Sequence, residues 1–278
     1  MEAKSDAGIA PFLKWAGGKR WLSERLTPAF EALKGAYIEP FLGSGAVFFR
    51  HLPINAVLSD ANPDLIECYL AVRDDPTGVS TELAALSKRP PDDSYYDVRA
   101  SKPNSSAGRA ARFLFLNRTC WNGLYRVNLK GEFNVPRGTK SQILLPSDNF
   151  VRVSEALQSA TLNVADFEES IAAAVEGDLI FADPPYTVAH NLNGFIKYNQ
   201  KIFSWEDQQR LARALTSAST RGVAVIATNA DHPDVRTLYE GFEHLSSLDR
   251  ASVIAAASQN RKRTTELFVS NAHAGLSL

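Results

Sequence analysis

Short apolar runs alternate with amphipathic stretches at both ends of this 278-residue chain, and no other feature constrains its fold as strongly. We expect helices to begin near Ala46 and near Pro63, and one to span about 205–216. The apolar runs that we expect to form strands are residues 36–39, 56–59, 161–164, 178–182, 222–228 and 266–270. Alternation of strands and helices is typical of a mostly parallel sheet with helices on both faces. The sequence therefore predicts an α/β fold.

The middle of the chain interrupts this alternation. It begins with several amphipathic stretches in a row, and it ends in residues 117–138, which are rich in glycine, asparagine and aromatic residues. The latter composition is typical of a hairpin or an extended loop. We therefore expect a discontinuous α/β domain of residues 8–72 and 150–278, and an insert of residues 73–149 with a hairpin at about 118–137.

Positive charge is concentrated in this insert, although the net charge of the chain is only −1. Between Arg99 and Arg152 there are ten lysines and arginines but only two acidic residues. A charge run is often no more than a solvated surface. On a nearly neutral protein, however, a local excess of this size favours an anionic partner, and nucleic acid is the leading candidate.

The chain offers little for a metal site or a disulfide framework. Its two cysteines, Cys68 and Cys120, are far apart in the sequence, and its five histidines are scattered. This usage is typical of a reducing cytoplasm. No apolar run approaches the roughly 20 residues that span a bilayer, and the first residues lack the apolar segment of a signal peptide. We therefore expect neither a bound metal nor a membrane partner.

An acidic residue and a Gly-x-Gly turn join an expected strand to an expected helix within Tyr37–Phe49. Glycines at such a turn let the backbone approach a ligand closely. Asp60 ends the next expected strand about 20 residues later, where a carboxylate can hold a ribose diol. The segment lacks the third glycine of the GxGxxG fingerprint, and a tight turn alone would explain its glycines. Together with Asp60, it indicates an adenosine-bearing cofactor.

A second glycine pair lies beside tryptophan and lysine in Leu13–Arg20. It is not a Walker phosphate loop, because Arg20 stands where that pattern needs serine or threonine. The segment either folds over a ligand carboxylate and an aromatic ring or is a turn that leads into a helix.

Asparagine, arginine and aromatic side chains are dense in residues 117–138. Arginine can read guanine and asparagine can read adenine in the major groove, and aromatic rings can insert between bases. A structural hairpin is the alternative, and the surrounding positive charge counts against it. The residues of this segment that we expect to contact DNA are Asn117, Arg118, Trp121, Asn122, Arg126, Asn128 and Arg137.

The sequence Asp183-Pro-Pro-Tyr186 follows the expected strand 178–182. Open α/β sheets bind ligands at the carboxyl ends of their strands, so this loop lies where a site is expected. Taken alone, it is also compatible with a loop that merely leaves a buried strand.

Six motifs occur in a characteristic order along the chain. They are LKWAGGK (13–19), EPFLGSG (39–45), DANPDLI (60–66), the Asn/Arg-rich segment that ends in GEFNVP (117–136), DPPY (183–186) and RKRTTEL (261–267). Over about residues 11–272, this ordered set resembles the Dam-like DNA adenine-N6 methyltransferases, which use S-adenosylmethionine (AdoMet). The DPPY motif alone is shared with some RNA and protein methyltransferases, whereas the ordered set is much more specific.

The resemblance implies a Rossmann-like AdoMet-dependent methyltransferase fold, with a mixed, mostly parallel seven-stranded sheet and a helical and β-hairpin DNA-recognition insert. It also implies roles for single residues. Those that match AdoMet-contacting positions are Trp15, Lys19, Glu39, Phe41, Gly43, Gly45, Asp60, Asp166, Phe167 and Asp183. Lys14 and Arg126 match base-contacting positions, and Trp121 stands where close relatives insert a tyrosine into DNA.

The catalytic residues that the resemblance implies are Asp183, Pro184, Pro185 and Tyr186. The lone pair of the adenine N6 amine is delocalised into the ring, so the amine is a poor nucleophile. We expect the Asp183 carboxylate and the Pro184 carbonyl to accept its two hydrogens and so to free the lone pair for attack on the sulfonium methyl. Pro185 fixes the backbone, and Tyr186 stacks on a base flipped out of the duplex. This chemistry needs no metal.

We therefore predict a site-specific adenine DNA methyltransferase (EC 2.1.1.72) that acts on double-stranded DNA. Residues 189–198 differ from the version typical of GATC-specific members, which leaves the target open as GATC or a related site. We expect a cytoplasmic monomer, encoded by a bacterium or phage and acting on nucleoid DNA; a cognate restriction endonuclease is left open. The alternatives are an AdoMet-dependent RNA or protein-glutamine methyltransferase and an inactive DNA-binding relative.

Overall fold

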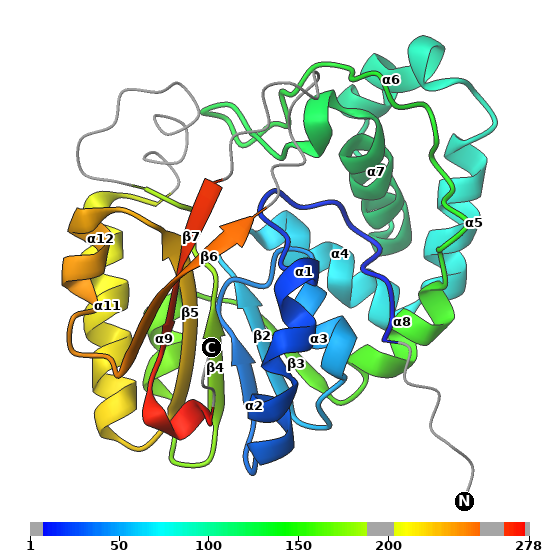
Figure 1. The fold of residues 1–278 in the computed structure, drawn as a ribbon. Helices are drawn as coiled ribbons and strands as arrows, with labels where there is room; N and C mark the ends of the chain where they lie inside the picture. The colour runs from blue at the N-terminus through cyan, green and yellow to red at the C-terminus, as the bar shows by residue number, and fades with distance from the viewer. Residues whose placement is uncertain (1–7, 188–202, 251–263, 276–278) are drawn as a thin grey trace, which may run out of the picture. The chain divides into compact units, whose positions relative to one another are not determined.

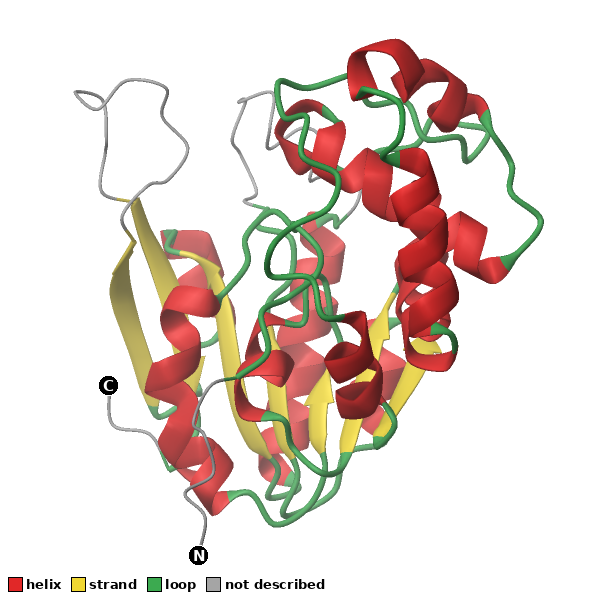
Figure 2. Cartoon of the chain, turned by 90° about the vertical axis from the view of Figure 1, so that its right-hand side faces the viewer, coloured by secondary structure: helices red, strands yellow, loops and turns green. Residues whose placement is uncertain are grey.

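The computed structural model describes residues 8–187, 203–250 and 264–275 and contains one seven-stranded sheet (Figures 1 and 2). The strands are β1 (Tyr37–Glu39), β2 (Ala56–Asp60), β3 (Ala160–Val164), β4 (Leu179–Ala182), β5 (Ala224–Ala230), β6 (His244–Arg250) and β7 (Thr264–Ser270). Their order is β3-β2-β1-β4-β5-β7-β6. β1 is parallel to β2 and β4, β4 is parallel to β5, and β7 is antiparallel to β5 and β6. This confirms the predicted mixed, mostly parallel seven-stranded α/β sheet.

All six expected strands are present, and the sequence prediction missed only β6 among the strands of the described residues. β6 lies at the edge of the sheet and pairs with β7 alone. Its sequence, HLSSLDR, has only two apolar side chains, so it lacks the apolar run that marks the buried strands. It forms because its backbone pairs with β7 along its whole length, from His244 opposite Ser270 to Arg250 opposite Thr264.

Contacts within the chain divide it into two compact units. The helical unit comprises the residues up to 25, together with 42–54 and 60–164. The sheet unit comprises residues 26–41 and 55–59, together with the residues from 165 onward. The predicted division at residues 73–149 stays a prediction.

The helical unit is built around α7 (Ser106–Thr119), ten residues of which are buried. Its other helices are α1 (Arg20–Ser23), α3 (Ala46–His51), α4 (Pro63–Asp74), α5 (Pro76–Leu86), α6 (Pro91–Ala100) and α8 (Phe150–Leu157). α7 packs against α4, α5 and α6. Side chains cap the helix starts: Ser105 accepts from the amide of Gly108 at α7, and Asn62 accepts from the amide of Asp64 at α4. Such caps satisfy amides that have no partner within the helix.

The side chain of Arg118 at the end of α7 is completely buried. Its Nη1 and Nη2 each donate to the Asp148 carboxylate at 2.7 Å. Nη1 also donates to the main-chain oxygen of Ile143, and Nη2 to that of Phe12. A buried charge is costly unless it is paired, and a bidentate carboxylate with two carbonyls supplies that pairing. One guanidinium thus joins three segments of the helical unit that are distant in sequence.

The sheet unit contains α2 (Thr27–Ala32), α9 (Phe167–Ala172), α11 (Trp205–Thr220) and α12 (Pro233–Leu238). α11 begins at a capping box, in which Ser204 and Asp207 bond to each other's backbone amides. Its Leu211 and Leu215 are fully buried, in one core with Ile180 of β4 and other strand residues. No helix within the described residues is long and apolar enough to cross a membrane.

Residues 120–138, called here the 120–138 loop, run as two antiparallel arms rather than two continuous strands. Isolated bridges join the arms, pairing Cys120 with Arg137 and Val127 with Phe133. At the tip, Oδ1 of Asn128 accepts from the amides of Lys130 and Glu132, and Gly131 has a φ of +75°. The expected hairpin is therefore an irregular antiparallel loop whose tip is held by an asparagine side chain.

We expect Arg118→Ala to lower the free energy of unfolding by about 3–5 kcal/mol, because it leaves the Asp148 carboxylate and two carbonyls without their donor. Urea denaturation measures this change. Arg89→Ala is the control, because the ion pair of Arg89 with Asp97 is exposed and its loss should cost about 1 kcal/mol or less. Equal effects of the two substitutions would contradict a structural role for Arg118.

Candidate active site

The predicted catalytic loop, Asp183–Tyr186, leaves β4 at the carboxyl edge of the sheet. All four residues of β4 are buried, and β4 lies between β1 and β5, to which it is parallel. The loop is therefore next to the carboxyl ends of both neighbours. Thr228 of β5 is fully buried, and its Oγ1 donates a hydrogen bond of 2.7 Å to Oδ1 of Asp183. This bond orients the Asp183 carboxylate.

The far end of the catalytic loop is held by β7. The hydroxyl of Tyr186 donates to Oε2 of Glu266 at 2.9 Å, and Glu266 is only 4% exposed. Burial raises the pKa of Tyr186 well above its usual range, and the nearby carboxylates of Asp183 and Glu266 raise it further. The phenol therefore stays neutral at physiological pH, and its bond to Glu266 restricts the orientation of the ring.

The main chain of the catalytic loop also contacts α11. Nε2 of the buried Gln208 donates to the carbonyl of Pro185 at 3.4 Å, and Oε1 of Gln208 accepts from Asn229 at 2.8 Å. Immediately after the loop, the hydroxyl of Thr187 donates to the carbonyl of Phe203 at 2.7 Å. Side chains of β5, β7 and α11 thus hold a loop whose two prolines donate no backbone hydrogen bonds.

Glu39, at the end of β1, adds another buried carboxylate to the sheet unit. It is 3% exposed, and its Oε2 accepts from the hydroxyl of Tyr37 at 2.8 Å. Burial, then Glu39, then Asp183 raise the pKa of Tyr37 well above its usual range. Glu39, Asp183 and Glu266 therefore create a negative field in this unit, which suits a cationic ligand.

The turn between β1 and α3 depends on its glycines. Gly43 and Gly45 have φ angles of +48° and +62°, which residues other than glycine rarely adopt. A Cβ at Gly43 would lie 2.7 Å from Cδ1 of Trp15, so the indole ring packs directly on the glycine backbone. The amide of Gly43 donates to Oδ2 of Asp60 at 3.1 Å. The helical unit therefore brings together three predicted cofactor residues: Trp15, Gly43 and Asp60.

The carboxyl group of Asp60 has an unusually high pKa. Burial raises its pKa to about 6, although the amides of Asn62 and Gly43 donate to the carboxylate and partly oppose this shift. Asp60 therefore changes charge close to physiological pH.

Lys19 is another buried charge in the helical unit. It is 2% exposed, and its Nζ donates to the carbonyl of Gly17 at 2.7 Å. The bond folds the side chain back over the glycine turn between Trp15 and α1. The segment 13–20 is thus a turn that leads into a helix and also places a buried ammonium group.

Three further predicted cofactor residues, Phe41, Asp166 and Phe167, lie in the sheet unit. The rings of Phe41 and Phe167 are 5.4 Å apart and nearly parallel. The guanidinium of Arg210 lies 4.8 Å from the centre of the Phe167 ring, and its Nη2 donates to Oδ1 of Asp166 at 3.0 Å. Hydrogen bonds to Glu168, Asp207 and Asp166 raise the pKa of Arg210. Arg210 therefore orients Asp166 and Phe167 together.

Asn117 contacts the backbone of Lys14 rather than projecting into solvent. It is 4% exposed; its Oδ1 accepts from the Lys14 amide at 2.9 Å, and its Nδ2 donates to the Lys14 carbonyl at 2.7 Å. Lys14 itself has an exposed side chain, and partial burial, followed by the charges of Arg118 and Lys140, lowers its pKa. Asn117 thus positions a predicted base-contacting residue.

Two of the arginines expected to contact DNA bond to carbonyl and carboxylate groups of the protein itself. Arg118 is the buried guanidinium described above. Nη1 of Arg137 donates to the carbonyls of Thr119, Gly138 and Lys140, and its Nη2 lies 3.1 Å from Oδ1 of Asp92. The structure therefore gives both arginines a role in folding, and we do not propose them as DNA contacts.

Four of the expected DNA-contacting side chains are exposed: Lys14, Trp121, Asn122 and Arg126. Trp121 is 51% exposed, which is unusual for a tryptophan. Asn122 has a φ of +54°, which places it at a sharp bend of the 120–138 loop. Nε of Arg126 donates to Oδ1 of Asn134 at 2.7 Å. The remaining expected contact, Asn128, holds the tip of this loop, and residues 189–198 lie outside the described residues.

Sequence reasoning missed Thr228, Glu266 and Arg210 as residues that hold the site. Glu266 belongs to the last of the ordered motifs, so the motif was the available signal, but no role was assigned to it. Thr228 ends an expected apolar strand, and nothing in the sequence pairs it with Asp183. Arg210 lies within a helix among other charged residues, where its partners are not predictable from spacing.

Comparison with known proteins identifies the family of this chain. The family model described as D12 class N6 adenine-specific DNA methyltransferase matches residues 15–253. Type II methyltransferase M1.LlaDCHI of Lactococcus lactis subsp. cremoris is 33% identical over 277 residues, covering 96% of this chain and 97% of that protein. The DNA adenine methylase of Haemophilus influenzae is 32% identical over 265 residues, covering 92% and 91%.

Type II methyltransferase M.MjaIII of Methanocaldococcus jannaschii is also similar, with 32% identity over 286 residues, 95% of this chain and 99% of that protein. The family model spans parts of both units, and each of these relatives covers more than nine-tenths of the chain. The chain therefore belongs to the D12 class of N6 adenine-specific DNA methyltransferases, which confirms the adenine-specific methyltransferase activity (EC 2.1.1.72) expected from its sequence.

Proposed function

We propose that this chain binds AdoMet with the residues that follow β1 and β2 and transfers the methyl group to N6 of an adenine flipped out of double-stranded DNA. Members of its family use AdoMet and act on adenine in DNA. The observation that carries the proposal is the Asp183–Tyr186 loop, which Thr228 holds at one end and Glu266 at the other.

The loop is suited to activating an exocyclic amine. The Asp183 carboxylate and the Pro184 carbonyl accept hydrogen bonds from the two N–H groups of N6. The nitrogen lone pair is then less delocalised into the ring and can attack the methyl group. AdoMet supplies an electrophilic methyl group on a sulfonium. N6 forms its bond to that carbon as the carbon–sulfur bond breaks, and Asp183 can take up the proton that N6 loses. Tyr186 stacks on the flipped base, which is worth about 1–3 kcal/mol.

The residues of the helical unit fit the polar end and the ribose of AdoMet. Trp15 packs on Gly43 where a Cβ would otherwise lie, so the glycine places the indole ring against the backbone of the turn. The Asp60 carboxylate is suited to accept hydrogen bonds from the two ribose hydroxyls. The buried Lys19 ammonium supplies the charge complementary to the methionine carboxylate.

The residues of the sheet unit fit the sulfonium and the adenine of AdoMet. Glu39 is a buried carboxylate and Asp183 is a partly exposed one, and both suit a sulfonium because it is a cation. Phe41 and Phe167 supply apolar faces for the adenine ring, and Asp166 supplies an acceptor for its amine. We propose that these residues of the sheet unit contact AdoMet, as Trp15, Lys19, Gly43, Gly45 and Asp60 do in the helical unit.

For DNA we propose contacts by the four exposed residues Lys14, Trp121, Asn122 and Arg126. An exposed arginine such as Arg126 can donate hydrogen bonds to a base edge, and an exposed Trp121 can enter the stack where the flipped base leaves a gap. The exposed Lys102, Lys130 and Lys140 of the same region would contact phosphates, so binding should weaken steeply with salt. A monomeric state, a cytoplasmic location and a cognate restriction endonuclease stay predictions.

Modified-base sequencing of DNA from a methylation-deficient host that expresses this chain tests the proposal. We expect N6-methyladenine at one short sequence, which would also identify the target as GATC or another site. A host that expresses the Asp183→Ala variant is the control and should show no modified base. A modification on cytosine, or none in the presence of folded protein, would refute the proposed function.

We expect Asp183→Ala to abolish methyl transfer while AdoMet still binds. Thr228→Val keeps the shape of residue 228 but removes the donor that orients Asp183, and a loss of about 10–100-fold in kcat should follow, because small misplacements of reacting groups have effects of this size. Thr228→Ser should retain most activity. Single-turnover kinetics measure these rates, and full activity of Asp183→Ala would disprove the mechanism.

Binding of AdoMet should depend on pH through Asp60. The ribose hydroxyls donate to the ionised carboxylate, and with a pKa of about 6 this form falls to roughly a tenth at pH 5. We therefore expect the Kd for AdoMet to rise about tenfold between pH 8 and pH 5. Asp60→Asn should bind weakly at both values and lose this dependence. Calorimetric titration measures it, and an equal pH dependence in Asp60→Asn would exclude Asp60 as its source.

Arg126→Ala should relax target choice at one base pair by about 1–3 kcal/mol. Lys130→Ala is the control, because it removes an exposed charge from the same loop and should weaken binding equally on all sequences. Competition between duplexes that differ at single base pairs separates the two cases. A uniform loss for Arg126→Ala would instead identify a phosphate contact.

A further inference from the structure

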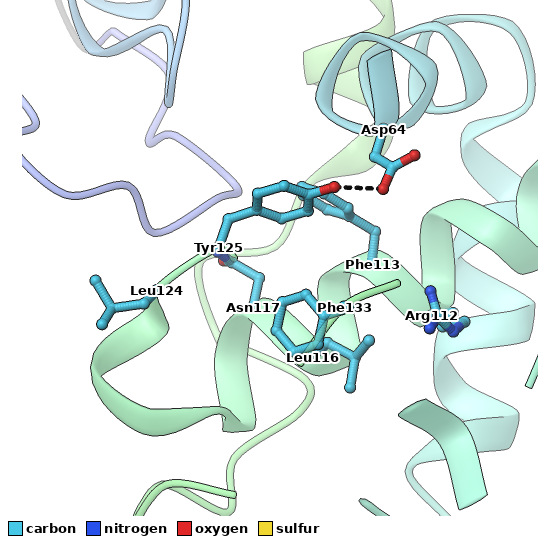
Figure 3. Close-up of a pocket in the computed structure, with 8 residues that line it drawn as sticks. All are labelled: Asp64, Arg112, Phe113, Leu116, Asn117, Leu124, Tyr125 and Phe133. Carbon is cyan, nitrogen blue, oxygen red and sulfur yellow. Dashed lines mark hydrogen bonds between the residues drawn. The ribbon is translucent and has the colours of Figure 1, made fainter. Parts of the chain in front are cut away.

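Tyr125 is the residue before Arg126 in the 120–138 loop, and its side chain is directed toward α4 (Figure 3). Its hydroxyl donates to Oδ2 of Asp64 in the first turn of α4. Figure 3 shows Phe113 of α7 and Phe133 of the same loop near its ring; the ring centres are 5.6 Å and 5.8 Å away. One tyrosine thus joins the loop to two helices of the helical unit.

The Tyr125 ring also contacts the cofactor side of the helical unit. It stacks on Trp15 at 6.1 Å between centres and 25° between planes. Trp15 in turn packs on Gly43 of the glycine turn. The Trp15 ring therefore connects Tyr125 of the 120–138 loop to Gly43 of the glycine turn.

A second route leads from the Tyr125 hydroxyl to Asp60. The amide of Asp64 donates to Oδ1 of Asn62 at 3.1 Å, and the amide of Asn62 donates to Oδ1 of Asp60 at 3.0 Å. Asp60 also accepts from the amide of Gly43. The two routes from Tyr125 therefore meet at the bond between Gly43 and Asp60.

We propose that Tyr125 is a positioning residue that couples AdoMet binding at Gly43 and Asp60 to DNA recognition by the 120–138 loop. The inference rests on the proposed function, because it takes Trp15, Gly43 and Asp60 as cofactor contacts and Arg126 as a base contact. A ligand that orders Trp15 and Asp60 also restrains Tyr125. DNA that binds afterwards therefore causes a smaller loss of conformational entropy in the 120–138 loop. By thermodynamic linkage, DNA must tighten AdoMet binding by the same factor.

The hydroxyl of Tyr125 distinguishes coupling from simple packing. A phenylalanine at this position would keep the contacts with Trp15, Phe113 and Phe133. The hydroxyl adds a bond to a carboxylate on a different element, and it is this bond that connects the loop to the Asn62–Asp60 chain. Tyr125→Phe therefore removes the hydrogen bond to Asp64 and keeps the stacking on Trp15. Tyr125→Leu removes both contacts.

The test is a binding cycle with full-length protein. Calorimetry measures the Kd of S-adenosylhomocysteine alone and in the presence of saturating duplex that carries the sequence found by modified-base sequencing. A scrambled duplex is run in parallel. The ratio of the two Kd values is the coupling factor, for which we expect about fivefold or more in the wild-type chain on the target duplex.

Tyr125→Phe should lower this factor to below about twofold, while the Kd of each ligand alone changes less than about threefold. Tyr125→Leu should abolish the factor, and Asp64→Ala, which removes the acceptor of the Tyr125 hydroxyl, should resemble Tyr125→Phe. Tyr96→Phe is the matched control, since it removes the hydroxyl of a tyrosine that is 54% exposed on α6, and it should leave the coupling unchanged.

The outcomes separate the inference from the proposed function. An unchanged coupling factor in Tyr125→Phe and Tyr125→Leu, or no coupling in the wild-type chain, would overturn the inference. Weaker binding of both ligands with the ratio preserved would show a purely structural role and would also overturn it. Failure of the proposed function has another signature: wild-type protein that does not bind S-adenosylhomocysteine, or an Asp60→Asn variant that binds it normally.

Discussion

The chemistry of this protein depends on β4 being buried between two parallel strands. Because β1, β4 and β5 run in the same direction, their carboxyl ends meet at one edge of the sheet, and Glu39, Asp183 and Thr228 lie at that edge. A loop with two prolines has few amides with which to hold itself in place. Thr228 of β5 and Glu266 of β7 therefore hold it through their side chains.

The reversed direction of β7 completes this arrangement. In the register of β5 with β7, Ala230 lies opposite Glu266, so a residue near the beginning of β7 reaches the carboxyl end of β5. A parallel strand in the same place would present its last residues there instead. Antiparallel pairing thus brings Glu266 to Tyr186 across 80 residues of sequence. The same strand also pairs with β6, which explains why a strand with little apolar character forms at the edge.

In the helical unit, polar residues of one motif divide into two groups. Asn117, Arg118 and Arg137 are turned inward and bond to backbone carbonyls, amides or a buried carboxylate, whereas Trp121, Asn122 and Arg126 are exposed. The inward group positions Lys14 and the 120–138 loop. Both groups have the same residue types and occur in the same segment. Sequence reasoning treated them alike for that reason, and burial separates them.

The sequence by itself determined the α/β class, the six apolar strands and the glycine turn, because apolar runs and glycines act on the backbone locally. It also determined the family, because ordered motifs do not depend on knowing contacts. Only the tertiary structure decided which side chains hold the loop, that burial moves the pKa of Asp60 to about 6, and that Tyr125 lies between Trp15 and Asp64. These properties depend on neighbours distant in sequence and on the exclusion of water, which no local pattern encodes.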